Sequence, residues 1–290
     1  TMKTENAPTA APLEPLVSPY LPLDQIVCGD NCDVLGTFPR ECIDLVVTSP
    51  PYDNLRTYGG HSWDFEGVAQ QLWRVIKPGG VVVWVVADAT IDGSETGTSF
   101  RQALRFMEIG FRLHDTMIYM KRNAIPLTHN RYEQQWEYMF VFSRGRPKTF
   151  TPLMENCKYA GTSQMGTFRH EGQETLPAHK QQPVKESRIR YNVWQFDVGN
   201  MKSSKDIFAF QHPATFPESL ARDHILSWSN EGDIVLDPFN GSGTTVKMAR
   251  EMGRRAVGIP LALRQLGAHG HAPRRSRDHR QKWPWGRTPQ

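Results

Sequence analysis

A glycine-rich string between a strand pattern and a helix pattern has the residue types of a ligand-binding loop. Residues 237–245 read Asp-Pro-Phe-Asn-Gly-Ser-Gly-Thr-Thr. Glycines let the backbone approach a ligand, and the following helix offers unpaired N–H groups. Lys247 comes too late for a phosphate-binding loop, and Val246 fits a dinucleotide fingerprint poorly. A tight turn explains a bare Gly-Ser-Gly, but the whole string is far more specific.

A second motif, Thr48-Ser49-Pro50-Pro51-Tyr52, follows the β-branched run 43–47. Open α/β sheets place their active sites at the carboxyl ends of such strands. The two prolines restrict the backbone, so the Ser49 hydroxyl and the nearby carbonyl groups are held rigidly, and an aromatic face follows. Taken in isolation, a stiff turn with a packed tyrosine explains Ser-Pro-Pro-Tyr slightly better than a catalytic role.

The elements around these motifs alternate between strand and helix patterns. Order is expected to begin near 25–28. Further strands are predicted at 43–47, 81–86, 114–121, 137–143, 233–237 and 256–259, and helices at 64–77, 98–108, 217–229 and 244–252. Pro78-Gly79-Gly80 is expected to end the first of these helices. Strands alternating with helices favour a parallel sheet flanked by helices.

Composition and length are those of an ordinary globular protein. The 290 residues are 39% hydrophobic and 22% charged, which suits one sizeable domain with an insert, or two small domains. The longest apolar run, 81–87, is too short for a membrane span, and no secretory signal is evident. The 4 cysteines match neither a disulfide framework nor a zinc site. We predict a cytoplasmic, metal-free protein with free thiols.

Positive charge is concentrated in two blocks of the chain. The net charge of +4 divides into −7 for residues 1–120, +7 for 121–205, −2 for 206–260 and +6 for 261–290. A basic block beside a neutral or acidic scaffold is what a phosphate-backbone partner requires. A solvated surface explains the pattern about equally well, so charge alone suggests nucleic acid without deciding it.

Together, the two motifs resemble those of the amino-group DNA methyltransferases that use S-adenosyl-L-methionine. Residues 49–52 look like their catalytic tetrapeptide and 237–245 like their cofactor loop. A catalytic motif that precedes the cofactor motif matches the circularly permuted beta group. The segment 29–35 resembles the strand-end segment that opens these enzymes. The segment 212–217 resembles the one that completes the methionine side of the cofactor pocket.

The resemblance implies an α/β, Rossmann-like methyltransferase fold, circularly permuted, with a mostly parallel, seven-stranded sheet flanked by helices. It divides the chain into five parts: a flexible leader (1–22), a catalytic half (23–144), a target-recognition insert (145–206), a cofactor-binding half (207–260) and a basic, irregular tail (261–290). The insert is polar, basic and dotted with aromatic residues.

The resemblance also assigns roles to particular residues. The catalytic set is Ser49, Pro50, Pro51 and Tyr52. Asp237 is placed near the charged amino acid end of the cofactor and Asp30 near its adenine; the other cofactor-binding residues are His212, Pro213, Ala214, Pro238, Phe239, Gly241, Ser242, Gly243 and Thr244. The insert supplies the expected DNA-binding residues Arg169, Lys185, Arg188 and Arg190. No metal site is predicted.

The chemistry of an exocyclic base amine accounts for the catalytic set. Its lone pair is delocalised into the ring, so acceptors such as the Pro50 carbonyl and the first side chain of the motif are needed to bind its N–H groups. The amine then attacks the sulfonium methyl in line, and positioning and electrostatics do most of the work. The base must leave the duplex, and Tyr52 offers it a stacking face.

The choice of base depends on Ser49. The resemblance associates Ser-Pro-Pro-Tyr mainly with N4-cytosine enzymes and Asp-Pro-Pro-Tyr mainly with N6-adenine enzymes. A serine can still serve an adenine enzyme, so the lean is about two to one toward a site-specific enzyme that forms N4-methylcytosine, and an N6-adenine enzyme of the same group is the alternative. Either would be expected to be of restriction-modification type. The carbon-5 cytosine class fits poorly because no cysteine follows a proline. The expected partners are double-stranded DNA and, in a prokaryotic, nucleoid-associated setting, a cognate restriction endonuclease. The expected state is a monomer or homodimer.

One departure from the family pattern lies after the strand predicted at 256–259. Members of the family usually carry an acid there that binds the ribose hydroxyls of the cofactor, whereas this chain has Pro260 and then a tail rich in Arg, His, Pro and Trp. A DNA-binding protein with degenerate catalysis is therefore an alternative to an active enzyme. An RNA or protein methyltransferase is a third reading, disfavoured by the basic insert.

Overall fold

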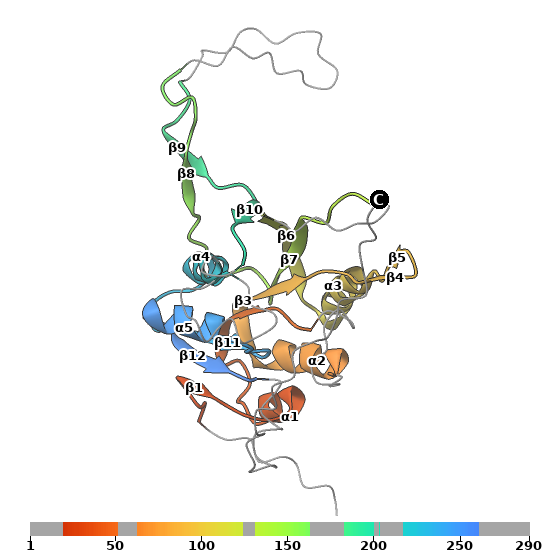
Figure 1. Cartoon of the computed structure of the whole chain (residues 1–290). Helices are drawn as coiled ribbons and strands as arrows, with labels where there is room; N and C mark the ends of the chain where they lie inside the picture. Colours follow the sequence, from red (N-terminus) through yellow and green to blue (C-terminus); the bar gives the residue numbers. More distant parts are fainter. Residues whose placement is uncertain are drawn as a thin grey trace, which may run out of the picture.

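The computed structural model describes residues 20–51, 63–123, 131–162, 183–199, 203 and 217–260, and it places a central sheet between two layers of helices (Figure 1). The helices are α1 (Asn31–Gly36), α2 (Phe65–Val75), α3 (Thr98–Ile109), α4 (Glu218–Trp228) and α5 (Thr244–Glu251). Within the described ranges, no helix has both the length and the apolar character needed to cross a membrane.

The central sheet has eight strands in the order β1-β12-β11-β2-β3-β7-β6-β10. Their bounds are β1 (Gln25–Ile26), β2 (Ile43–Thr48), β3 (Ile76–Val86), β6 (Arg112–Lys121), β7 (Trp136–Ser143), β10 (Val193–Phe196), β11 (Ile234–Asp237) and β12 (Arg255–Gly258). The pairings of β7 with β3 and β6 are antiparallel, and the other pairings are parallel. The late strands β11 and β12 lie between the early strands β1 and β2, as a permuted chain order requires.

Consecutive residues of the strands point to opposite faces of the sheet, so both faces are apolar. In β3, Val82 and Trp84 belong to the core beneath α1, α2 and α3, whereas Val81 and Val83 belong to the core beneath α4 and α5. All four side chains are buried. This explains why residues 81–86 form an unbroken apolar run.

Local signals start the helices that flank the site. The Asp64 carboxylate accepts a hydrogen bond from Gly67 N at 3.0 Å and caps α2. Pro217 occupies the N-cap position of α4, where its missing N–H costs nothing. The predicted end of α2 was wrong by two residues: the helix stops at Val75. Ile76 already pairs with Ile43, so β3 starts there and contains the Pro-Gly-Gly segment.

The sheet has eight strands rather than the expected seven because β10 adds an edge strand. Residues 193–196 pair in parallel with β6, although they lie within the stretch 145–206 that was predicted to be the insert. Trp194 and Phe196 are buried on one face of this strand, while Val193 and Gln195 are exposed. The alternation is too short to stand out in a polar, basic stretch, which is why sequence reasoning missed it.

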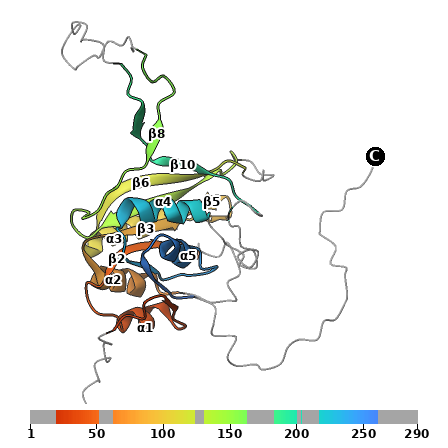
Figure 2. The same cartoon turned by 90° about the vertical axis from the view of Figure 1, so that its left-hand side faces the viewer.

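The remaining strands form two small antiparallel pairs outside the central sheet. β4 (Thr90–Ile91) and β5 (Ser94–Glu95) make a hairpin between β3 and α3. β8 (Met154–Asn156) and β9 (Ser187–Ile189) make a ribbon that stands away from the sheet beyond β10 and α4, as both views show (Figures 1 and 2). The ribbon therefore projects from the core, and the described segments 157–162 and 183–186 continue beyond it.

Candidate functional site

The carboxyl ends of β2 and β11 mark the place where the connections of the sheet diverge. The two strands are parallel neighbours, with Val46 beside Leu236. The chain leaves β2 toward α2 on one face and leaves β11 toward α5 on the other. Ligands of open α/β sheets bind at such a topological switch point. Both sequence motifs begin where these strands end, so the fold brings them side by side.

A buried hydrogen-bond network joins the two motifs. Thr48 Oγ1 donates to Asp237 Oδ1 at 2.6 Å, and Phe239 N donates to the same oxygen at 3.0 Å. Thr245 Oγ1 donates to the carbonyl of Val47 at 3.1 Å. The last residue of β2 is thereby fixed to the last residue of β11, and the start of α5 is fixed to β2.

The carboxyl group of Asp237 has an unusual environment for an acid. It is 3% exposed, and burial raises its pKa to about 6, although the hydrogen bonds from Thr48 and Phe239 act in the opposite direction. These two donors therefore favour its ionised form. The resemblance places Asp237 beside the cofactor, which stays a prediction. In the structure its carboxylate links the end of β2, directly before the tetrapeptide, to the start of the loop.

The loop after Asp237 leaves room for a ligand to come close to its backbone. Gly243 is the N-cap of α5 with φ +83°, a conformation that L side chains rarely adopt, and a Cβ there would meet no atom within 4 Å. Gly241 is exposed, whereas Pro238 and Phe239 are buried beneath the loop. The hydroxyls of Ser242 and Thr244 lie 2.9 Å apart at the start of α5. A polar or anionic group fits against the unpaired N–H groups of this first turn.

The tetrapeptide begins directly after β2. Pro50 and Pro51 are buried and Ser49 is half-buried, so these residues are fixed at the edge of the sheet next to the loop. Tyr52 lies outside the described residues, as do His212, Pro213, Ala214 and Arg169. Their assigned roles stay predictions.

The segment predicted to lie near the adenine packs against the cofactor loop. Asp30 caps α1, with Oδ1 accepting from Cys32 N at 2.9 Å. The next residue, Asn31, is buried and its Nδ2 donates to the carbonyl of Pro238. Sequence reasoning missed Asn31 because its partner is more than two hundred positions away. It missed Thr48 as a site residue too, although Thr48 directly precedes Ser49.

The basic residues assigned to DNA binding differ in their surroundings. Lys185 and Arg188 are exposed on or beside the ribbon. The Arg188 guanidinium pairs with Glu155 across the ribbon at 2.7 Å and lies 3.8 Å from the ring centre of Tyr191. Arg190 instead donates to Asp223 Oδ2 at 2.8 Å and lies 4.5 Å from the ring centre of Trp194. Arg190 thus ties the base of the ribbon to α4. The assignment of these residues and of Arg169 to DNA binding stays a prediction.

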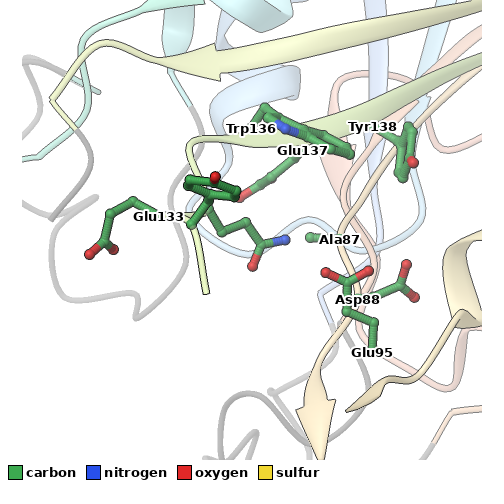
Figure 3. A pocket seen from close by; sticks show the side chains of 9 residues that line it. Ala87, Asp88, Glu95, Glu133, Trp136, Glu137 and Tyr138 are labelled. Atoms are coloured by element: carbon green, nitrogen blue, oxygen red, sulfur yellow. The ribbon is translucent and has the colours of Figure 1, made fainter. Parts of the chain in front are cut away.

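A cavity of about 170 Å³ opens where β3 ends and β7 begins. Acidic and aromatic side chains line it, among them Asp88, Glu137, Trp136 and Tyr138 (Figure 3). The Asp88 carboxylate accepts hydrogen bonds from Ser99 N at 2.9 Å and Ser99 Oγ at 2.5 Å, while Glu137 pairs with Lys121 at 2.5 Å. Such a cavity suits a flat group with N–H donors better than a phosphate.

A family model described as DNA methylase, covering N6 and N4 enzymes, matches residues 43–265. The orphan methyltransferase M.BamHII of Bacillus amyloliquefaciens is 56% identical over 223 residues, which cover 76% of this chain and 84% of that protein. The type II methyltransferase M.SmaI of Serratia marcescens is 25% identical, with 82% of this chain and 86% of that protein covered.

Solved structures show the same architecture. The cytosine-N4-specific PvuII DNA methyltransferase superposes with a TM-score of 0.58 at 21% identity, over 81% of this chain and 80% of that one. A Thermus thermophilus protein described as a DNA modification methylase, complexed with S-adenosyl-L-methionine, gives 0.51 at 26% identity, over 82% and 89%.

The fold and the paired motifs define a methyltransferase whose two halves occur in permuted order. With the matches above, the chain belongs to the N6/N4 family of DNA methyltransferases, which use S-adenosyl-L-methionine as methyl donor.

Proposed function

We propose that this chain methylates the exocyclic N4 of cytosine at specific sites in double-stranded DNA, on a base that has left the helix. The observation that carries this proposal is the direct hydrogen bond between Thr48 and Asp237, because it joins a Ser-Pro-Pro-Tyr tetrapeptide to a glycine-rich loop at the switch point. The serine at position 49 supports cytosine over adenine. The PvuII enzyme, whose name specifies N4 of cytosine, shares the fold.

In this proposal the tetrapeptide positions the exocyclic amine of the base. The Ser49 hydroxyl and the Pro50 carbonyl accept hydrogen bonds from the two amine hydrogens, which turns the nitrogen lone pair out of the ring plane. Both prolines are buried, so these acceptors keep their places without reorganisation. Tyr52 stacks on the extruded base. When bound, the cofactor supplies an activated methyl group on sulfur.

The cofactor lies over the loop 238–243 and the first turn of α5. Gly241 and Gly243 allow close approach of the backbone, and Asp30 at the start of α1 is on the same side as the loop through the contact of Asn31 with Pro238. His212, Pro213 and Ala214 complete the methionine side. The acidic cavity beside β3 favours the base, with its N–H donors, over the phosphate backbone.

Methylation of unmodified DNA followed by nucleoside mass spectrometry tests the proposal. The wild-type chain should produce N4-methylcytosine, and Ser49→Ala should lower turnover by about 10²-fold while cofactor affinity, measured by calorimetry, changes little. Production of N6-methyladenine would assign the other base. Cofactor binding without any methylated product would instead support the DNA-binding protein with degenerate catalysis.

A further inference from the structure

The end of β12 lacks the group that doubly wound folds use to bind a cofactor ribose. In these folds an acid at the end of the strand after the glycine-rich unit, about 20 residues beyond the loop, accepts a hydrogen bond from a ribose hydroxyl. Here β12 ends at Gly258, and Ile259 and Pro260 follow. The first carboxylate after this point in the sequence is Asp278.

Asn240 lies against the same strand end. Its backbone N–H donates to the carbonyl of Ile259 at 3.0 Å. A Cβ placed on Gly258 would come within 2.7 Å of both Cγ and Nδ2 of Asn240, so the absence of a side chain at 258 makes room for this amide. The loop thus carries a polar side chain to the place where β12 itself supplies none.

The side-chain oxygen of Asn240 has no hydrogen-bond partner among the described residues, although the residue is only 1% exposed. Buried acceptors are nearly always satisfied, and leaving one unpaired costs about 1–3 kcal/mol. An unpaired acceptor inside a cofactor loop indicates a partner that comes with the ligand. A ribose hydroxyl is a donor of the required kind.

We infer that Asn240 Oδ1 accepts a hydrogen bond from a ribose hydroxyl of S-adenosyl-L-methionine, in place of the acid at the end of the strand. The inference rests on the proposed placement of the cofactor over this loop. A neutral amide supplies one acceptor without adding a second carboxylate near the buried Asp237. In this arrangement Gly258 leaves the space that the Asn240 amide occupies.

Calorimetry with S-adenosylhomocysteine and its 2′-deoxy and 3′-deoxy analogues tests the inference without any turnover. The wild-type chain should bind at least one deoxy analogue about 10-fold more weakly than the parent. Asn240→Leu keeps the branched heavy-atom shape of the side chain but has no acceptor, so the parent and this analogue should bind it equally. Asn240→Asp keeps an acceptor and should still discriminate. Circular dichroism establishes that each variant is folded.

The possible outcomes separate this inference from the proposed function. A leucine variant that discriminates between parent and analogue as strongly as the wild type overturns the role of Asn240 alone. If the leucine variant does not fold, the aspartate variant decides, because loss of discrimination there also overturns the inference. A wild-type chain that does not bind S-adenosylhomocysteine overturns the proposed cofactor site together with it.

Discussion

At the scale of single residues, one buried contact determines how the two motifs face each other. Asp237 ends β11, Thr48 ends β2, and their side chains are 2.6 Å apart in a region that water does not reach. The sequence predicted both motifs and their order. It did not predict this contact, because the partners are 189 positions apart and each is an ordinary strand-end residue.

The first prediction replaces Thr48 by valine, which keeps the branched shape and removes the hydroxyl. Asp237 then loses one of its donors while it stays buried, so the free energy of unfolding should fall by about 1–3 kcal/mol. Cofactor affinity should fall several-fold because the loop loses one of its two side-chain hydrogen bonds to β2, while that of Thr245 remains. Denaturant unfolding and calorimetry measure the two effects.

Thr37→Val is the matched control for this change. Thr37 Oγ1 also makes a single hydrogen bond, to the carbonyl of Val34 at 2.7 Å at the end of α1, but it touches neither motif. Its replacement should leave cofactor affinity unchanged. If Thr48→Val also left stability and affinity at their wild-type values, the buried bridge would have no part in forming the site.

At the scale of elements, the sequence was informative where a local rule applies and uninformative where a distant partner decides. The cap at Asp64 and the proline before α4 are local, and both helices form close to where they were expected. The start of β3 depends on the pairing of Ile76 with Ile43, and β10 depends on a neighbour in β6. Neither pairing can be recognised from the pattern of apolar residues in the sequence.

The packing of α4 on the sheet contains a histidine that is kept neutral. His224 is fully buried, with Nε2 3.3 Å from the sulfur of Met139 and its ring 4.6 Å from that of Trp194. Burial, with a smaller contribution from the charge of Arg190, lowers its pKa to about 3 from the ordinary 6.5. Below pH 6.5, His224 therefore binds a proton in the unfolded chain but stays neutral in the folded chain.

The second prediction follows from this difference in proton uptake. As the pH falls from 6.5 toward 3, His224 should reduce the stability of the fold, with a slope approaching about 1.4 kcal/mol per pH unit. His224→Phe keeps a ring against Trp194 and should flatten the decline between pH 6.5 and 4.5. Thermal midpoints across this range measure it. His114→Phe, a change at an exposed histidine, should leave the decline as it is.

At the scale of the whole molecule, charge and shape separate the cofactor side from the DNA side. The sequence located a basic, aromatic stretch at 121–205, and the structure shows that part of it builds the projecting ribbon while another part joins the sheet. Charge counting cannot distinguish the two: both arginines pair with a carboxylate, Arg188 with Glu155 on the exposed ribbon and Arg190 with the buried Asp223 of α4. Only the fold reveals that Arg188 is exposed on the ribbon while Arg190 is held against α4.

The last prediction assigns part of the DNA affinity to the ribbon. Lys185 and Arg188 are exposed, and each phosphate that they neutralise contributes about −0.9 to the slope of log affinity against log salt. Lys185→Gln combined with Arg188→Gln should weaken binding and flatten the slope by up to about two units.

Arg250→Gln combined with Arg255→Gln is the matched control, because it removes the same charge from the end of α5 and the start of β12. These positions lie near the amino end of β12, whereas the motifs lie at the carboxyl ends of the strands, so the slope of that variant should match the wild type. Equal slopes in both double variants would show that the two ribbon residues do not contact phosphate, and DNA binding would then have to depend on other parts of the chain.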